Sequence, residues 1–207
     1  LIFPFDYREG QKDLAVSVYR TIARKKRLFI QAPTGVGKTL SVLFPALKAM
    51  GEGLASRIFY LTARTITRTV AVDALDLLRQ QGMELKTVVL TAKEKLCVCE
   101  KPECDPDHCP RAKGHFDRIN QAVYELWTTG PDACTREVIL ESAERYKVCP
   151  FELSLDLAVW VDTLICDYNY VFDPNVSLKR FFADGVREDY LFLIDEAHNI
   201  AVHLWLI

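Results

Sequence analysis

The 207-residue sequence has no uninterrupted run of about 18 apolar residues, the length that a membrane-spanning helix needs. Its N-terminus lacks the basic segment followed by an apolar segment that marks a secretion signal. It also has no internal repeat and no low-complexity tract. Nothing in the sequence therefore predicts membrane insertion or export, and we expect a cytoplasmic protein, in a bacterial cytosol or nucleoid rather than a nucleus.

The composition predicts a globular chain with an uneven charge. Half of the residues are hydrophobic, which suffices for one domain with a core and a smaller insert. The net charge is −2, but residues 1–85 hold 13 basic and 7 acidic residues, whereas residues 86–207 hold 13 and 21. Seven cysteines in a reducing cytosol do not indicate a disulfide framework, so the clustered ones are better candidates for metal ligands.

Short β-rich runs alternate with helical stretches, which predicts an α/β fold with a parallel sheet and crossover helices. The expected buried strands are residues 28–31, 57–62, 87–90, 162–166 and 190–194. The expected helices are residues 38–50 and 65–81, followed by Gly51 and Gly82 as stop signals. Residues 97–150 break this pattern with Pro, Cys and acidic residues, then helical segments at 116–127 and 135–147, and this predicts an insertion.

Residues 32–39, Ala-Pro-Thr-Gly-Val-Gly-Lys-Thr, follow an expected strand and open an expected helix. Backbone N–H groups and the positive helix end bind phosphate there, and glycines let the backbone come close. Lys38 can reach the β- and γ-phosphates, and the Thr39 hydroxyl can bind Mg²⁺. Ala32 replaces the usual first glycine, so the first turn cannot need a positive φ. The alternative is an ordinary strand-to-helix turn. The predicted ATP-binding residues of this loop are Thr34, Gly35, Val36, Gly37, Lys38 and Thr39.

An acidic Asp-Glu-Ala-His box, residues 195–198, follows the apolar run at 190–194. Asp195 is expected to hold Mg²⁺, and Glu196 to act as the general base that polarises the attacking water. His198 is expected to couple the nucleotide state to neighbouring motifs. A solvated helix start would also suit these residues, but the phosphate loop elsewhere in the chain favours ATP hydrolysis.

These motifs resemble superfamily 2 helicases, specifically the iron-sulfur DNA helicases of the XPD/DinG family, over most of the chain. The resemblance implies a RecA-like P-loop NTPase domain. Residues 5–11, Phe-Asp-Tyr-Arg-Glu-Gly-Gln, look like the element that reads adenine before the phosphate loop in these enzymes, which assigns Tyr7, Arg8 and Gln11 to ATP binding. The Gln11 amide suits this role because it both donates and accepts hydrogen bonds.

Two further segments resemble the DNA-binding elements of the family. Residues 61–65, Leu-Thr-Ala-Arg-Thr, are similar to the motif that holds the DNA backbone, which implies phosphate contacts from Thr62, Arg64 and Thr65. Thr62 or Thr65 could equally cap a helix. Residues 166–170, Cys-Asp-Tyr-Asn-Tyr, resemble the element that lies against single-stranded DNA and assign it Tyr168 and Asn169. The alternation of Tyr168 with Tyr170 also fits a strand with one buried face.

The family's cluster ligands correspond to Cys97, Cys104, Cys109 and Cys149, which implies a 4Fe-4S cluster. The spacing alone also fits zinc, with His108 as a possible substitute ligand. Cys99 lies two residues after Cys97 and could replace it. The sequence leaves both choices open, and it predicts ordinary free thiols at the two remaining cysteines, Cys134 and Cys166.

The resemblance implies an ATP-dependent DNA helicase that moves 5′ to 3′, acts on single-stranded and forked DNA, works in DNA repair and is a monomeric motor. We expect motor-domain segments at residues 1–92 and 151–207 around an iron-sulfur insert at 93–150. The chain begins at Leu1 rather than Met and lacks the family's arch and second motor domain, so we expect a fragment with weak or no activity of its own. The alternatives are a zinc-bearing regulatory ATPase that binds nucleic acid without moving on it, and an RNA helicase of the Asp-Glu-Ala-His class.

Overall fold

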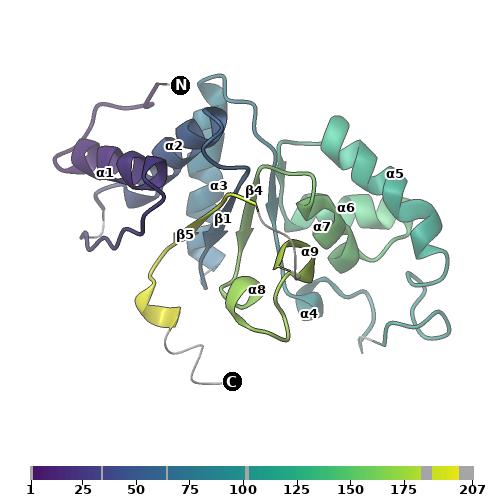
Figure 1. The fold of residues 1–207 in the computed structure, drawn as a ribbon. Helices are drawn as coiled ribbons and strands as arrows, with labels where there is room; N and C mark the ends of the chain where they lie inside the picture. Colours follow the sequence, from purple (N-terminus) through teal and green to yellow (C-terminus); the bar gives the residue numbers. More distant parts are fainter. Residues whose placement is uncertain (1, 34, 64, 101–102, 183–187, 201–207) are drawn as a thin grey trace. The chain divides into compact units, whose positions relative to one another are not determined.

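The computed structural model describes residues 2–33, 35–63, 65–100, 103–182 and 188–200 (Figure 1). The chain divides into two compact units, the first formed by residues Leu1–Glu84 and Ile165–Ile207 and the second by Leu85–Leu164. The segment predicted as an insert, residues 93–150, lies entirely within the second unit. Across the described ranges, every helix is too short or too polar to cross a membrane.

The first unit holds both ends of the sequence and contains three long helices with two parallel strands. Its elements are α1 (Gln11–Ala23), α2 (Lys38–Gly51), β1 (Arg57–Leu61), α3 (Thr65–Gln80), α8 (Asn169–Phe172), α9 (Lys179–Phe182) and β5 (Tyr190–Ile194). β1 pairs in parallel with β5, from Arg57 opposite Tyr190 to Leu61 opposite Ile194. The strand β4 (Thr163–Cys166) ends in this unit, where the Thr62 N–H donates to the Cys166 carbonyl at 3.0 Å. The strand order in this unit is therefore β4-β1-β5.

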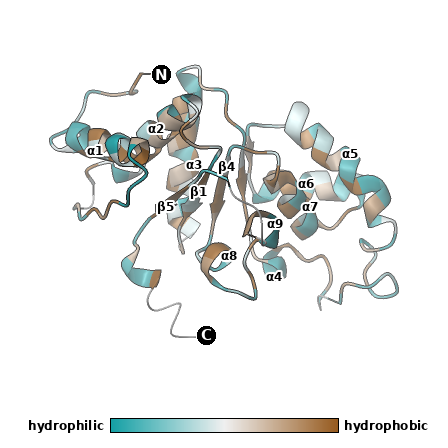
Figure 2. Ribbon diagram, in the orientation of Figure 1, coloured by the Kyte–Doolittle hydropathy of each residue, from teal (hydrophilic) through white to brown (hydrophobic). Residues whose placement is uncertain are grey.

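The core of the first unit forms around β1, which is buried along almost its whole length. Phe59 of β1 stacks on Phe192 of β5, with ring centroids 5.2 Å apart, and makes edge contacts with Phe181 and Tyr190 at 5.3 Å. α2 packs against α1, α3 and both strands. Figure 2 shows hydrophobic colour along β1 and β4 and a mixture of colours on α1. A fully apolar strand is expected when both faces of a parallel sheet are covered.

One expected strand is wrong: residues 28–31 form no strand. The Phe29 side chain is 89% exposed, and Leu28 and Ile30 are also exposed. Apolar residues with high β-propensity form a strand only when a neighbouring strand supplies the hydrogen-bond ladder. No strand pairs with this segment among the residues that the structure describes, and it is instead a loop that lines a cavity.

The second unit is mainly helical. Its elements are β2 (Thr87–Val89), α4 (Lys93–Leu96), α5 (His115–Thr128), β3 (Ala133–Cys134), α6 (Arg136–Tyr146), α7 (Pro150–Ala158) and the start of β4. β2 pairs in parallel with β3, and the Lys86 carbonyl before β2 accepts from the Asp162 and Thr163 N–H groups at 3.0 and 3.2 Å. The order here is β3-β2-β4. The two-residue β3 was not expected, because two residues are too short to show any periodicity.

Arginine side chains join the helices of the second unit at their ends. Arg118 of α5 donates to the Tyr146 and Lys147 carbonyls, at 3.0 and 2.9 Å, where α6 ends. Arg111 donates to the Ala143 carbonyl at 3.0 Å, one turn earlier on α6. The Tyr146 and Lys147 carbonyls have no partner within the helix, so the Arg118 bonds satisfy groups that would otherwise need water, whereas the Ala143 carbonyl also accepts the Val148 N–H at 3.0 Å. The cysteine-rich loop that precedes α5 is thereby attached to a packed three-helix core of α5, α6 and α7.

Candidate functional site

The phosphate-binding loop enters α2 through two glycines in the left-handed region, Gly35 with φ 84° and Gly37 with φ 74°. Ala32 does not adopt a positive φ, as its side chain requires. The Lys38 ammonium donates to the Ala32 carbonyl at 2.8 Å and so lies across the loop. Thr34 lies outside the described residues. The loop thus has the backbone freedom and the lysine position that phosphate binding needs.

Gly37 has a second constraint, because a side chain there would collide with the Gln11 amide. Gln11 is buried, and its Oε1 accepts the Arg8 N–H at 2.8 Å. The Arg8 guanidinium donates to the Gly35 carbonyl at 2.7 Å. These contacts join the start of α1 directly to the phosphate loop, which is how an adenine-reading element and a phosphate site can share one nucleotide.

Replacing Gly37 by Ala is therefore expected to weaken ATP binding by at least about tenfold and to lower the free energy of unfolding by about 1–2 kcal/mol. The φ of 74° is unfavourable for Ala, and its Cβ would displace Gln11. Titration with a fluorescent ATP analogue and thermal melting test both effects. The matched control is Gly53→Ala. Gly53 also has a positive φ, but a Cβ there would meet open space, so this variant should lose stability without losing affinity for ATP.

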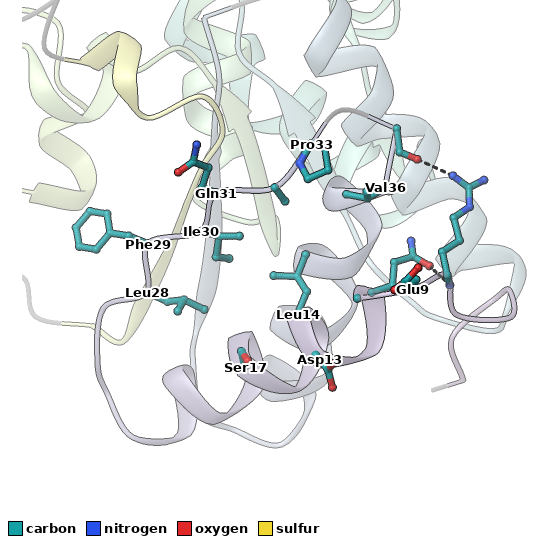
Figure 3. A pocket seen from close by; sticks show the side chains of 15 residues that line it. Glu9, Asp13, Leu14, Ser17, Leu28, Phe29, Ile30, Gln31, Pro33 and Val36 are labelled. Carbon is teal, nitrogen blue, oxygen red and sulfur yellow. Dashed lines mark hydrogen bonds between the residues drawn. The ribbon is translucent and has the colours of Figure 1, made fainter.

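A cavity of about 770 Å³ lies between α1 and the phosphate loop (Figure 3). Its wall includes the apolar side chains of Leu14, Leu28, Ile30, Pro33 and Val36, and Arg8 and Gln11 lie at the same wall. Phe29 points away from it in Figure 3. Its volume is in the range of small-molecule sites, which are mostly apolar with a few polar groups. Tyr7, the remaining predicted residue of this element, stacks on Phe3 with ring centroids 4.2 Å apart.

The acidic box begins immediately after β5. The Asp195 N–H continues the parallel ladder by donating to the Leu61 carbonyl at 3.0 Å. The Asp195 carboxylate in turn accepts the Glu196 N–H at 3.0 Å. Glu196 has a φ of 49°, one of three non-glycine residues with a positive φ among those described. Asp195 is half-buried, whereas Glu196 and His198 are exposed.

Tyr60 of β1 connects the acidic box to the phosphate loop. The side chains of Thr39 and Asp195 both lie close enough to its buried hydroxyl to shift the pKa of that hydroxyl. Burial, and then the charge of Asp195, raise the Tyr60 pKa far above its usual value, so the hydroxyl keeps its proton. The two side chains predicted to bind Mg²⁺ therefore lie within reach of a single hydroxyl group. A hydroxyl and a carboxylate are oxygen ligands of the kind that Mg²⁺ prefers.

The predicted DNA-binding residues differ in exposure. Thr65 is exposed at the start of α3, and Asn169 is half-buried at the start of α8, where its N–H donates to Asp167 at 3.1 Å. Thr62 and Tyr168 are buried, with 2% and 1% of their surfaces exposed, and their contacts are with protein. Arg64 lies outside the described residues. Thr65 and Asn169 are the two described candidates whose side chains reach the surface.

The predicted cluster ligands all lie in the second unit. Cys97 follows α4, and Cys149 caps the start of α7. Partial burial and the thiols of Cys109 and Cys97 raise the pKa of Cys99, so the Cys99 thiol lies near each of these two. A hydrogen bond from the Lys93 ammonium to Cys104 raises the lysine pKa, and Cys149 lies nearby. Within the described ranges, these side chains form no group of three or more that could already hold a metal ion.

Two residues at the site were not identified from the sequence, Tyr60 and Lys93. A buried tyrosine needs a partner for its hydroxyl, so Tyr60 in an otherwise apolar strand was a usable signal. Lys93 lies four residues before Cys97, one helical turn away, but a single lysine at that spacing carries no specific signal. Cys134 and Cys166 are both buried, and their assignment as ordinary thiols stays a prediction.

The loop, the box and the parallel strands define a RecA-like P-loop NTPase domain. The DEAD_2 family matches residues 61–204, and the DEAD/DEAH box helicase family matches residues 12–101. The solved structure of an XPD helicase aligns with 96% of this chain and 34% of its own, with a TM-score of 0.66 and 20% identity. A truncated XPD structure aligns with 93% of this chain and 53% of its own, with a TM-score of 0.62 and 18% identity.

Curated relatives are longer than this chain. The regulator of telomere elongation helicase 1 homolog of Caenorhabditis elegans is 24% identical over 241 residues, and the human protein of that name is 23% identical over 256 residues. Each alignment covers 96% of this chain but only 24% and 20% of the relative. The chain belongs to the DEAD_2 family.

Proposed function

We propose that this chain is the first motor domain of an ATP-dependent DNA helicase and that it binds the nucleotide which drives translocation and unwinding. The observation that carries the proposal is the place of Tyr60, whose buried hydroxyl lies near both Thr39 and Asp195 and so links the two halves of an ATP site in a member of the DEAD_2 family. In this role Lys38 contacts the β- and γ-phosphates, and Thr39 and Asp195 hold Mg²⁺. Glu196 accepts a proton from the attacking water.

Base recognition is proposed for the cavity beside α1. Gln11 can read the adenine edge because its amide both donates and accepts, and the Leu14, Ile30 and Val36 side chains offer an apolar wall for the ring. The Arg8 bond to Gly35 keeps this wall and the phosphate loop together. An adenine specificity over guanine is expected from this arrangement.

Single-stranded or forked DNA is the proposed substrate, with 5′ to 3′ movement by a monomeric motor in the cytosol. Support comes from Thr65 and Asn169, which present a hydroxyl and an amide at the surface of the unit that holds the ATP site. Such groups donate to phosphate oxygens without reading sequence. An arginine from a second motor domain normally completes hydrolysis, so turnover belongs to the full-length protein.

A 4Fe-4S cluster is proposed for the second unit, held by Cys104, Cys109 and Cys149 together with either Cys97 or Cys99. The donor set fits, because five thiols gather in two groups in this unit and the Lys93 ammonium lies beside Cys104 and Cys149, where it can offset thiolate charge. A bound cluster would cross-link segments too short to form a core of their own.

The direct test of this function is ATP hydrolysis by the full-length protein with and without single-stranded DNA. We expect hydrolysis to rise at least about tenfold on saturation with DNA, because DNA draws the two motor domains together over the nucleotide. Single-stranded RNA of the same length and base sequence is the matched control, and it should stimulate less. Greater stimulation by RNA would indicate an RNA helicase. No stimulation by either nucleic acid would contradict the proposed motor function.

A further inference from the structure

The hydroxyl of Tyr168 lies where three segments of the first unit meet. It donates to the Asp195 carbonyl and lies 3.3 Å from the Glu196 carbonyl, so it contacts the backbone of the acidic box. It also accepts a backbone hydrogen bond from Ala63, in the segment that follows β1. Burial raises the Tyr168 pKa to about 12, so the hydroxyl stays protonated and remains a donor at neutral pH.

The backbone that Tyr168 contacts is under strain. Glu196 has a φ of 49°, in the left-handed region that costs a non-glycine residue about 1–3 kcal/mol. Such a conformation persists only where surrounding contacts hold it. The contacts that hold it include the Glu196 N–H bond to the Asp195 carboxylate, the Tyr168 hydroxyl beside the Glu196 carbonyl, and the Asn199 N–H, which donates to the same carbonyl at 2.9 Å. The direction of the Glu196 side chain follows from this backbone conformation.

The main chain of Tyr168 continues directly into Asn169, one of the two surface candidates for DNA contact. Its neighbour Asp167 accepts the Asn169 N–H at 3.1 Å and forms an ion pair with Arg68 of α3 at 3.4 Å. Both charged side chains of this pair are largely buried, so solvent screens it less than a surface pair. A shift of Asn169 or of the start of α3 would therefore move the main chain that carries the Tyr168 ring.

We propose that Tyr168 is a positioning residue that holds Glu196 in its left-handed conformation and couples it to the Asp167–Asn169 segment. DNA contact at Asn169 and Thr65 would then adjust the direction of the Glu196 carboxylate through the Tyr168 hydroxyl. This inference rests on the proposed function, because it assumes that DNA stimulates ATP hydrolysis. It gives Tyr168 a role inside the unit in place of the direct DNA contact that the resemblance implies.

The test is the Tyr168→Phe variant of the full-length protein, which keeps the ring and removes only the hydroxyl. We expect the DNA-stimulated kcat for ATP hydrolysis to fall about tenfold, with the KM for ATP and the Kd for single-stranded DNA within about twofold of wild type. Hydrolysis without DNA should fall much less. Tyr19→Phe is the matched control, since it removes a hydroxyl bonded to Glu52 at the surface of the same unit, and it should behave as wild type.

Three results would overturn the inference. A Tyr168→Phe variant with wild-type DNA stimulation would show that the hydroxyl does not couple the two sites. An equal loss of kcat with and without DNA would restrict Tyr168 to supporting the ATP site. A wild-type protein that DNA does not stimulate would overturn this inference and the proposed function together, whereas the first two results leave the proposed function standing.

Discussion

Replacing Glu196 by Gln in the full-length protein is expected to lower the kcat for ATP hydrolysis at least about a hundredfold. The amide has nearly the same shape as the carboxylate but cannot accept a proton from the attacking water. ATP binding should stay within about twofold of wild type, because Lys38, Thr39 and Asp195 remain. Phosphate release and titration with a fluorescent ATP analogue measure the two quantities separately.

The matched control is Glu84→Gln, which removes a carboxylate from the exposed surface of the same unit and should leave kcat unchanged. Hydrolysis by Glu196→Gln within a few-fold of wild type would contradict the assignment of the general base. Loss of ATP affinity together with hydrolysis would point to collapse of the box instead, since Glu196 holds a conformation that the neighbouring chain must support.

The second large effect is expected from Cys149→Ser. A serine hydroxyl is a much poorer ligand for an iron-sulfur cluster than a thiolate, so the purified protein should lose most of its iron and acid-labile sulfide. The second unit should also melt at a lower temperature, because Cys149 begins α7 and Cys109 lies in the loop before α5, and a shared cluster would join them. Iron and sulfide analysis of anaerobically purified protein and thermal melting measure the two effects.

Cys134→Ala is the matched control, since Cys134 is a buried thiol of the same unit outside the proposed ligand set. It should keep the wild-type iron content. Comparing Cys97→Ser with Cys99→Ser identifies the remaining ligand as the position whose loss removes iron. Zinc without iron in the wild-type protein would contradict the cluster and favour the zinc-bearing regulatory ATPase.

The sequence predicted the elements whose local signals agree with their surroundings. α2 starts at Lys38, as the phosphate-loop pattern requires, and β5 spans Tyr190–Ile194, as the apolar run before the acidic box indicates. α3 and α5 lie within one residue of their predicted ends because each has a clear apolar face. The Ala32 argument against a positive φ also agrees with the structure.

The features that the sequence did not predict depend on tertiary contacts, which no local sequence pattern encodes. Residues 28–31 have the composition of a strand but no neighbouring strand to pair with in the described structure. Their β-propensity alone therefore gave a wrong strand prediction. Tyr168 follows a strand end, where the sequence left both DNA contact and a buried strand face open, and in the structure its ring is buried and its hydroxyl contacts the backbone of the acidic box. Tyr60 acts at a point where three distant segments meet, which the order of residues along the chain does not reveal.

A strand-displacement assay measures whether this domain powers DNA unwinding in the full-length protein. The full-length protein would be mixed with ATP and a fluorescent partial duplex that carries a 5′ or a 3′ single-stranded tail. Our account predicts ATP-dependent displacement from the 5′-tailed duplex, little from the 3′-tailed duplex, and none with Glu196→Gln. Active hydrolysis of ATP without displacement from either duplex would contradict it.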